Sequence, residues 1–421
     1  MATAPARVVP VVISQHAEMA AHLHRVRTVH AHASHVKLLH LLRVDNRLAA
    51  HLDGLKVSGE TGASVCLRAL EDPDPGVMFT AAVGSIERHD HAGLARLHAL
   101  AGAAPKVRSG LIAAFGWVER GALRGIVAAN LSSDDPVTRL TAVAAGALHR
   151  VDPGLVSARR IVDASPLVRA RALRTAGEIG CVDVLASCEA ALRDDDPEIL
   201  FWAAWSMVLL GNRGVALDAL TRAGQTAGAN RSRAFRLSLQ AMPISDAHRV
   251  LKHLATDPEQ LRWLIQGTGI IGDPTYVPWL IGHMEQNETT RLAGEAVSLI
   301  TGLNLALLDL ERKPPEDFES GPNDDPNDPN VDMDQDDGLP WPDPIKIKAW
   351  WAENGNRFQS GSRYFMGAPV TREHCIDVLR SGYQRQRILA ARYLCLLQPG
   401  TPLFNTSAPA RRQQSLLAQM S

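Results

Sequence analysis

Four aspartates in the C-terminal third of the chain have a spacing that could bind a calcium ion. Asp332, Asp334, Asp336 and Asp343 match positions 1, 3, 5 and 12 of a calcium-binding loop. The match is incomplete, because the glycine falls one place late, at Gly338, and the last position lacks the bidentate glutamate. We therefore interpret the surrounding run as a solvated acidic linker and keep weak calcium binding as the alternative.

Histidines are concentrated near the N-terminus, where residues 1–51 hold eight of the sixteen. His30, His32 and His35 could chelate a metal on a flexible segment, but no cysteine or acid accompanies them at ligand spacing. On a helix, residues two apart point about 200° from each other, so His30 and His32 cannot share an ion. We therefore expect helix-surface histidines and no metal site among the eight: His16, His22, His24, His30, His32, His35, His40 and His51.

The sequence contains no motif that points to a reaction. GxSxG, HExxH and a cysteine flanked by a base are all absent. The segment GTGIIG at 267–272 matches the dinucleotide fingerprint, which works only between a strand and a helix. Here Asp273 and Pro274 follow at once, and Gly272 falls where a helix should end. The sequence thus predicts a protein that is not an enzyme and binds no cofactor.

Three of the eight tryptophans lie within eleven residues, at Trp341, Trp350 and Trp351. We favour a cap that covers the apolar face of the last repeat, and contact with a partner is the alternative. Adjacent helical residues diverge by about 100°, so we expect one of Trp350 and Trp351 to pack inward and the other to meet a second surface. The candidate partner-binding residues are Trp341, Trp350, Trp351, Arg357, Phe358 and Tyr364.

Composition bounds the class of protein. The apolar content of 46% is carried mainly by Ala, Leu and Val, which suits packed helices. Five cysteines form no CxxC pair, and no segment resembles a secretory signal or a membrane span, so we expect a cytoplasmic protein. The net charge of −1 hides an acidic run at 311–344, and the mildly basic remainder is a weaker signal than the basic stripe of a nucleic-acid-binding protein, so we expect no nucleic-acid partner.

An internal period of about thirty residues organises the chain. Six prolines are separated by 30, 31, 30, 31 and 61 residues, and most of them follow Asp or Ser, which caps a helix: Pro75, Pro105, Pro136, Pro166, Pro197 and Pro258. Apolar residues then recur at helical spacing, and Gly180, Gly211 and Gly272 lie fourteen residues after their prolines, where a helix would stop. Each unit is therefore predicted to be a helix, a turn and a second helix.

These units resemble a known repeat. DDPVTRLTAVAAGAL (134–148) and SPLVRARALRTAGEIG (165–180) resemble the HEAT-type repeat in its short bacterial form. An arginine recurs three residues after each start, and we interpret it as a structural ladder that pairs with neighbouring aspartates, with a basic ladder for phosphates as the alternative: Arg108, Arg139, Arg169, Arg231 and Arg291.

The ends carry a narrower resemblance. LLRVDNRLAAHLDGLKVSGE (41–60), the segment LPWPDP…WW…RF…G.RY (339–364) and SGYQRQRILAARYL…APARRQQ (381–414) are similar to an uncharacterised bacterial HEAT-repeat family. Members are often encoded beside type VI secretion components, and the family has no established activity. The resemblance implies a secretion setting rather than a mechanism. Some other HEAT-like solenoids are DNA glycosylases or bilin lyases, which keeps a nucleic-acid-binding or enzymatic protein as an alternative.

Together these observations predict an all-α, right-handed α-solenoid of HEAT-like two-helix repeats with helical caps. The expected divisions are a His-rich cap at 1–59, the repeat array at 60–310, a disordered acidic linker at 311–338 and a closing cap at 339–421. The expected function is a non-enzymatic scaffold or adaptor for another protein, such as a secretion effector or spike component, acting in type VI effector loading. An immunity protein that neutralises an effector is a further alternative.

Overall fold

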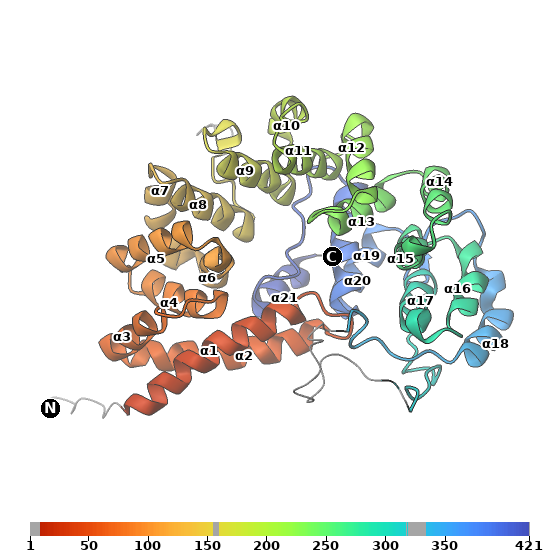
Figure 1. The fold of residues 1–421 in the computed structure, drawn as a ribbon, viewed down its shortest axis with the longest axis horizontal. Helices are drawn as coiled ribbons and strands as arrows, with labels where there is room; N and C mark the ends of the chain where they lie inside the picture. Colours follow the sequence, from red (N-terminus) through yellow and green to blue (C-terminus); the bar gives the residue numbers. More distant parts are fainter. Residues whose placement is uncertain (1–8, 155–159, 317, 319–333, 421) are drawn as a thin grey trace. The chain divides into compact units, whose positions relative to one another are not determined.

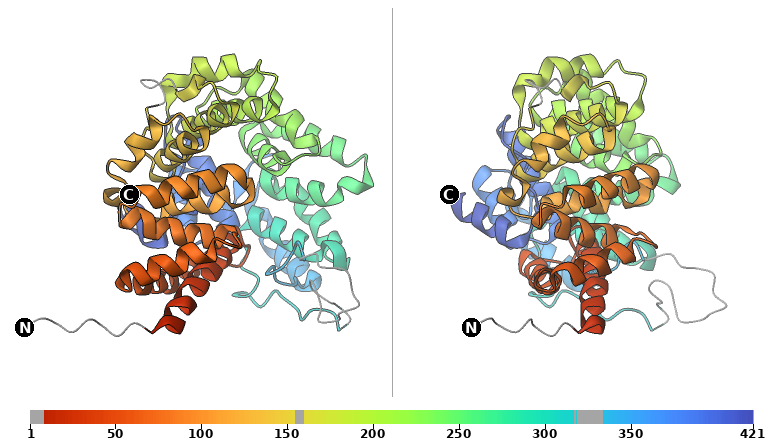
Figure 2. Two further views of the ribbon diagram at one scale, coloured as in Figure 1. Left: turned by 60° about the vertical axis from the view of Figure 1, so that its left-hand side comes forward. Right: turned by 90° about the vertical axis from the view of Figure 1, so that its left-hand side faces the viewer.

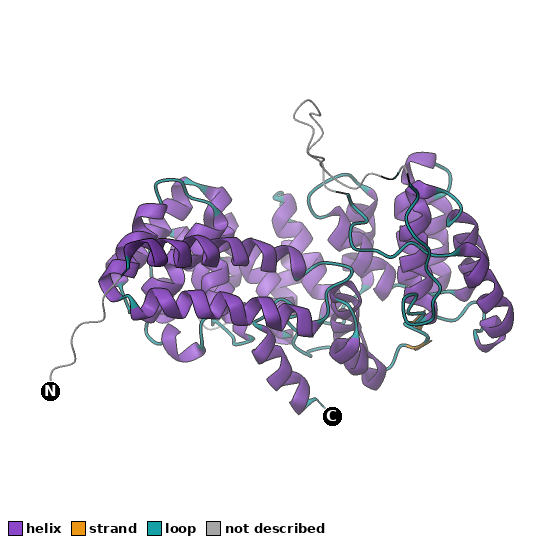
Figure 3. Cartoon of the chain, turned by 90° about the horizontal axis from the view of Figure 1, so that it is seen from below, coloured by secondary structure: helices purple, strands orange, loops and turns teal. Residues whose placement is uncertain are grey.

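A computed structural model describes residues 9–154, 160–316, 318 and 334–420. The described chain is built from helices, with one short antiparallel hairpin of β1 (Tyr364–Phe365) and β2 (Ala368–Pro369), in which Tyr364 pairs with Pro369 (Figure 3). The predicted all-α fold class is thus confirmed. No helix in the described ranges combines the length and the apolar content needed to cross a bilayer.

The chain folds into two compact units. Unit 1 comprises residues 9–32, 36–212 and 398–420 of the described chain. Its helices are α1 (Pro10–His30), α2 (Leu38–Val57), α3 (Gly59–Ala69), α4 (Pro75–Glu87), α5 (His91–Ala103), α6 (Arg108–Trp117), α7 (Ile126–Leu131), α8 (Pro136–His149), α9 (Pro166–Ile179), α10 (Leu185–Ala191), α11 (Pro197–Leu209) and α21 (Ala410–Gln419).

Unit 2 comprises residues 33–35 and the described part of 213–397. Its helices are α12 (Gly214–Gln225), α13 (Arg231–Ala241), α14 (Ile244–Leu254), α15 (Leu261–Ile271), α16 (Val277–His283), α17 (Asn287–Thr301), α18 (Pro344–Asn354), α19 (Arg372–Ser381) and α20 (Gln384–Leu397). The predicted divisions at 60, 311 and 339 stay predictions. The two units divide the predicted closing cap itself, between residues 397 and 398.

The prolines begin helical turns as predicted. Pro75, Pro136, Pro166 and Pro197 open α4, α8, α9 and α11, and Pro105 and Pro258 open 3-10 turns that lead into α6 and α15. Asp carboxylates cap several of these starts, as at Asp196, which accepts hydrogen bonds from the N–H groups of the first turn of α11. These caps satisfy donors that a helix start leaves free.

The predicted glycine stops are also present. Gly180, Gly211 and Gly272 all have a positive φ, between 72° and 93°. A left-handed residue at this place ends a helix at little cost only when it is glycine. Their neighbours leave no room for a Cβ, since one built on Gly272 would lie 1.9 Å from the carbonyl oxygen of Tyr364. The glycines therefore serve both the turn and a close approach of another segment.

Within each unit the first helices of successive pairs stack on one another. In unit 1, α1, α4, α6, α8, α9 and α11 follow in contact, and in unit 2 α13, α15 and α17 do the same (Figure 1). The views in Figure 2 show the layers of unit 1 from two further sides. The predicted core positions of α8 and α11, such as Leu140, Val143, Phe201 and Val208, are buried. Apolar burial between neighbouring pairs is the main stabilising term of such stacks.

In unit 1 the C-terminal segment 398–412 runs across the ends of the stacked helices. The N–H of Leu403 donates to the carbonyl of Glu178 at the end of α9 (3.0 Å), and Asn405 donates to Leu148 O of α8 (3.2 Å). Arg412 donates to the carbonyls of Gly116 and Val118, where α6 ends. The segment thus satisfies carbonyls that helix ends leave without partners.

In unit 2 the segment 361–367 crosses the ends of the stacked helices in the same way. Tyr364 N–H donates to Gly272 O at the end of α15 (2.8 Å), and Met366 N–H donates to Leu299 O of α17 (2.6 Å). Arg363 donates to Leu239 O and Met242 O, where α13 ends (2.8 and 2.9 Å). Both units are therefore closed along their helix ends by residues from the last sixty positions of the chain.

Candidate functional site

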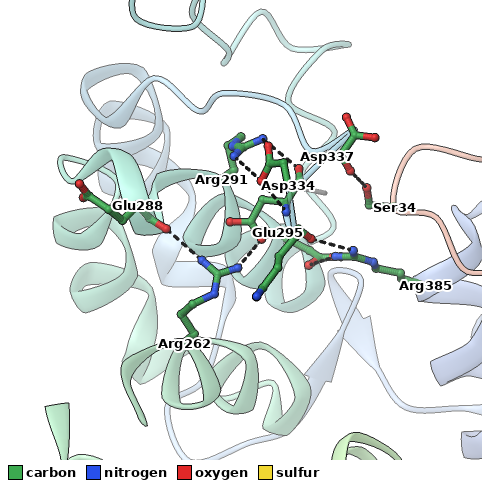
Figure 4. Close-up of polar contacts among 10 residues, drawn as sticks. Ser34, Arg262, Glu288, Arg291, Glu295, Asp334, Asp337 and Arg385 are labelled. Carbon is green, nitrogen blue, oxygen red and sulfur yellow. Dashed lines mark hydrogen bonds and ion pairs between the residues drawn. The ribbon is translucent and has the colours of Figure 1, made fainter. Parts of the chain in front are cut away.

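Three arginines of unit 2 surround the segment Asp334–Asp337 (Figure 4). Arg262 lies in the first turn of α15, Arg291 in the second turn of α17, and Arg385 in the first turn of α20. The stacking of α15 on α17 brings the first two together, and α20 adds the third. We call Arg262, Arg291 and Arg385 the arginine site.

Arg291 makes the closest contacts of the arginine site. Its Nη1 and Nη2 donate to the two carboxylate oxygens of Asp334 (2.7 and 3.0 Å), and Nη1 also donates to Asp336 O (3.1 Å). The guanidinium carbon lies 4.8 Å from the ring centre of Phe318 and 5.0 Å from that of Trp341. A planar guanidinium bound through both its arms and stacked on rings is a geometry that lysine cannot reproduce.

Arg262 and Arg385 bind the rest of the segment. Arg262 Nη2 donates to the Asp336 carboxylate (2.6 Å), and its Nη1 donates to the carbonyl of Glu288 (3.0 Å). Arg385 pairs with Glu295 of α17 (3.0 Å) and donates to Gln335 O at 3.5 Å. Ser34 adds a hydrogen bond to Asp337 O (3.1 Å).

The charges of the arginine site balance within the described residues. Three guanidinium groups face three carboxylates: Asp334, Asp336 and Glu295. Burial would raise the pKa of the Asp334 carboxyl, but hydrogen bonds from Arg291 and the Asp336 N–H, with the charges of Arg291 and Arg262, lower it below its usual value. Asp334 therefore stays ionised, which keeps the segment attached at neutral pH.

Two cavities adjoin the segment. One of about 470 Å³ is lined by Asn287, Glu288, Phe318, Gln335 and the charged groups of the site. Another of about 320 Å³ is lined by His35, Leu305, Leu339, Tyr383, Arg385 and their neighbours. Gly338, between them, has φ +74°, and a Cβ built on it would lie 1.8 Å from His35 Nδ1. Only glycine fits at this turn of the segment.

A second feature of unit 2 is a row of aromatic rings that starts on α18. Trp350 and Trp351 have ring centres 6.5 Å apart, Trp351 and Phe358 stack at 5.6 Å, and Phe358 meets Tyr364 at 5.1 Å. Arg357 is exposed and lies over Trp350 and Phe358, at 5.8 and 5.9 Å. All four rings are half-buried. We call these five residues the aromatic row.

The structure thus gathers five of the six candidate partner-binding residues in the aromatic row and separates the sixth. Trp341 is buried, with Phe318 and Arg291 beside it. The expectation that Trp350 and Trp351 face different surfaces is wrong, because both pack against the same apolar cluster, around Ile347, Leu280 and Ile300. Positions 350 and 351 come three and four residues after the buried Ile347, so on a helix both lie next to the face that Ile347 turns toward the cluster.

The arginines of the proposed ladder have several kinds of partner. Arg139 pairs through two bonds with Asp163 (2.9 and 3.0 Å), and Arg169 meets Asp194 at 3.5 Å. Arg108 donates to the carbonyl of Ala101, and Arg231 donates to Gly224 O and to the Gln260 side chain. Arg291 belongs to the arginine site.

The metal and cofactor motifs occupy ordinary structural positions. Asp343 caps α18, GTGIIG lies inside α15 and ends at Gly272, and Asp332 falls outside the described residues. His16 and His51 contact each other through their Nδ1 atoms (3.0 Å). Over the described ranges, no three His, Cys, Asp or Glu side chains gather as metal ligands do.

Sequence reasoning missed Arg262, Arg385 and Phe318 as site residues. Arg262 falls outside the repeated arginine position, and Arg385 lies about 120 residues further along the chain. One signal was present: a run with twelve acids needs counter-charges, and the excess of about nine positive charges elsewhere had to supply them. Which arginines supply them depends on contacts between distant helices.

Comparison with protein-family models gives one match, in which residues 153–240 match the model of HEAT repeats. The matched stretch includes α9, α10, α11, α12 and most of α13. The match supports the predicted resemblance to HEAT-repeat proteins over this part of the chain. No curated protein matches the sequence.

Proposed function

We propose that the protein is a non-enzymatic scaffold or adaptor that binds another protein through the aromatic row of unit 2. HEAT repeats commonly serve as protein-interaction scaffolds, and the match over 153–240 supports that general role. The observation that carries the proposal is that four connected, half-buried aromatic rings and an exposed arginine lie together on α18 and the segment that follows it. Trp, Tyr and Arg dominate the energetics of protein interfaces.

Exposed apolar side chains at the start of α18 add to the surface of unit 2. Ile345 in the first turn of α18 is 81% exposed, and Leu307 is 80% exposed. Lys346 donates to the carbonyl and the carboxylate of Asp309 (2.7 and 2.9 Å), which places the loop that holds Leu307 next to the start of α18. Exposed apolar groups of this size are typical of a surface that a partner covers.

The setting of this function is part of the proposal. The end motifs resemble those of the bacterial family encoded beside type VI secretion components, which supports an effector or a spike component as the partner and effector loading as the task. None of the five cysteines forms a disulfide, and burial raises the pKa of Cys66 to about 11 and that of Cys188 to about 12. Unreactive free thiols support a cytoplasmic location.

A site-specific photo-crosslinker tests the surface. A benzophenone amino acid in place of Arg357 or Ile345 should capture a partner in cells of the native host. The matched control is the same group at Arg249 of α14, also in unit 2, whose side chain is 77% exposed. A product found at 357 and 345 but absent at 249 supports the proposal. The same product at all three positions, or at 249 alone, contradicts it.

Binding measurements then test the energetics. Phe358→Ala and Arg357→Ala should each weaken binding to the captured partner by about 2 kcal/mol, roughly thirtyfold in Kd. Because Arg357 is exposed, its replacement should leave the melting temperature unchanged. An affinity within about twofold of the wild type for both variants would show that the partner binds somewhere else.

A further inference from the structure

We propose that the arginine site is a docking site for an acidic peptide of Asp-x-Asp type. In this structure the chain's own Asp334–Asp337 occupies it, and a matching segment of a partner protein takes its place when the internal segment leaves. This inference concerns a second surface and does not depend on the aromatic row.

The contacts of the internal segment are those that any Asp-x-Asp peptide could make. Arg291 binds the first carboxylate and Arg262 binds the second, two residues later (2.7 and 2.6 Å). The remaining bonds go to backbone carbonyls, from Arg291 to Asp336 O, from Arg385 to Gln335 O and from Ser34 to Asp337 O. Recognition therefore needs two carboxylates at this spacing and a turned backbone, and nothing else of this sequence before Gly338.

Departure of the internal segment would remove the carboxylate partners of Arg262 and Arg291, so these arginines would attract another anion. Arg291 is only 7% exposed, and among the described residues its side chain has no carboxylate partner besides Asp334. Arg262 likewise pairs with Asp336, while Arg385 keeps Glu295. Arg262, Arg291 and Arg385 would then be gathered on one face with only Glu295, of the described carboxylates, to balance them, so the emptied site would attract a new pair of carboxylates.

The surroundings have room and unused hydrogen-bonding capacity for a ligand. The cavity of about 470 Å³ opens beside Arg262, Arg291 and Phe318. The Nε–H of Arg291 is buried and has no acceptor within the described chain. Buried donors are nearly always paired in folded proteins, so the internal segment leaves one donor of the arginine site unsatisfied.

The internal segment has an advantage over a free peptide because it belongs to the same chain as the arginine site. A tethered ligand acts at an effective concentration of about a millimolar, so it excludes a free peptide of ordinary affinity. A partner therefore gains access only if it binds more tightly or if the internal segment is weakened. Whether the internal segment occupies the arginine site therefore controls whether a partner can dock there.

Fluorescence anisotropy of a labelled hexapeptide, Asp-Gln-Asp-Asp-Gly-Leu, tests the proposal on the full-length protein. The Asp334→Asn/Asp336→Asn variant removes the internal carboxylates and should bind the peptide at least about tenfold more tightly than the wild type. The control peptide, Asn-Gln-Asn-Asn-Gly-Leu, should not bind. Adding Arg262→Gln, at a partly exposed position, should reverse the gain in affinity while the melting temperature holds.

Several results would overturn the proposal. They are equal binding of the acidic peptide by the wild type and the double variant, equal binding of the control peptide, or no effect of Arg262→Gln. A single-stranded oligonucleotide that binds as tightly as the peptide would overturn the assignment to a protein partner. If the double variant unfolds at a lower temperature than the wild type, the single variant Asp336→Asn replaces it in the test, because this variant keeps the Arg291–Asp334 pair. A gain in its affinity for the peptide supports the proposal, and an unchanged affinity contradicts it.

Discussion

Units 1 and 2 are closed by the same device but with different chemistry. In each, a later part of the chain crosses the ends of stacked helices and binds their free carbonyls. Unit 1 completes this closure with a buried ion pair: Arg27 and Asp45 lie 2.7 Å apart, Arg27 donates to Ser407 O and Ala408 O, and Asp45 accepts from Ala410 N–H. Arg27 is 9% exposed and Asp45 is 5% exposed.

Unit 2 instead leaves polar and aromatic groups within reach. Its arginine site adjoins a cavity of about 470 Å³, and the aromatic row is half-buried. The comparison shows that a segment crossing the helix ends can either bury its own contacts fully or leave a surface exposed for binding. We therefore expect unit 1 to respond to mutation in stability and unit 2 to respond in binding.

The largest effect is expected from Asp45→Ala in unit 1. The change leaves Arg27 buried without its carboxylate and removes the acceptor for Ala410 N–H, which should cost about 3–5 kcal/mol of unfolding free energy. Urea unfolding measures the loss. Asp53→Ala, at an exposed position of the same helix, is the matched control. A loss below about 1 kcal/mol for Asp45→Ala would show that the C-terminal segment is not anchored here.

The second largest effect is expected from acid, which should lower the unfolding free energy of unit 1. Burial, aided by the charge of Arg27, lowers the pKa of His24 to about 4, and burial lowers the pKa of His149 to about 4 as well. In the unfolded chain both titrate near 6.5, so between pH 6.5 and 4 the unfolded state binds more protons. Unfolding free energy should therefore fall as pH drops through this window, by about 3 kcal/mol per histidine at full effect.

Unfolding in urea at pH 7.5, 6, 5 and 4 measures this dependence. His149→Gln keeps an amide donor for Phe115 O, to which His149 Nε2 now lies at 2.8 Å, but cannot titrate. The variant should therefore show a flatter pH profile than the wild type. If the two profiles have the same slope, His149 is not a source of the acid sensitivity.

The arginine ladder of unit 1 should give a smaller effect on stability. Arg139→Lys removes the paired bonds to Asp163 and those to Ser133 O and Asp134 O, and should cost about 1–3 kcal/mol. Arg108→Lys is the control, because its bonds to Ala101 O are long, at 3.3–3.4 Å, and the change should cost less than about 1 kcal/mol. Equal melting temperatures for the two variants would refute a structural role for the Asp163 pair.

The smallest change in stability is expected when an exposed apolar side chain is replaced, and such a replacement distinguishes the two units by binding alone. Ile345→Ser in unit 2 and Val57→Ser in unit 1 both change a highly exposed apolar side chain (81% and 85%). Each should alter unfolding free energy by less than about 0.5 kcal/mol. Only Ile345→Ser should weaken binding of the crosslinked partner. Equal loss of binding in both variants would remove the distinction between the units.

The sequence was sufficient for the features that depend on neighbours along the chain. An Asp or Ser before a proline starts a helix because its side chain, or its extended backbone, sets up the first turn, as at Asp135 and Ser165. A glycine such as Gly180 ends a helix because it tolerates a positive φ. The apolar spacing of α8 and α11 fixes their buried faces. These local rules gave the all-α repeat.

Tertiary structure alone decided where the charges and rings of unit 2 meet. Arg262, Arg291, Arg385 and the segment Asp334–Asp337 are separated by up to about 120 positions, and no periodic pattern links them. Likewise the predicted closing cap reads as one element in the sequence, but its residues close two different units, up to Leu397 in one and from Gln398 in the other. Charge attraction and helix-end carbonyls act through space, so the partner of each group is fixed only when the helices have stacked.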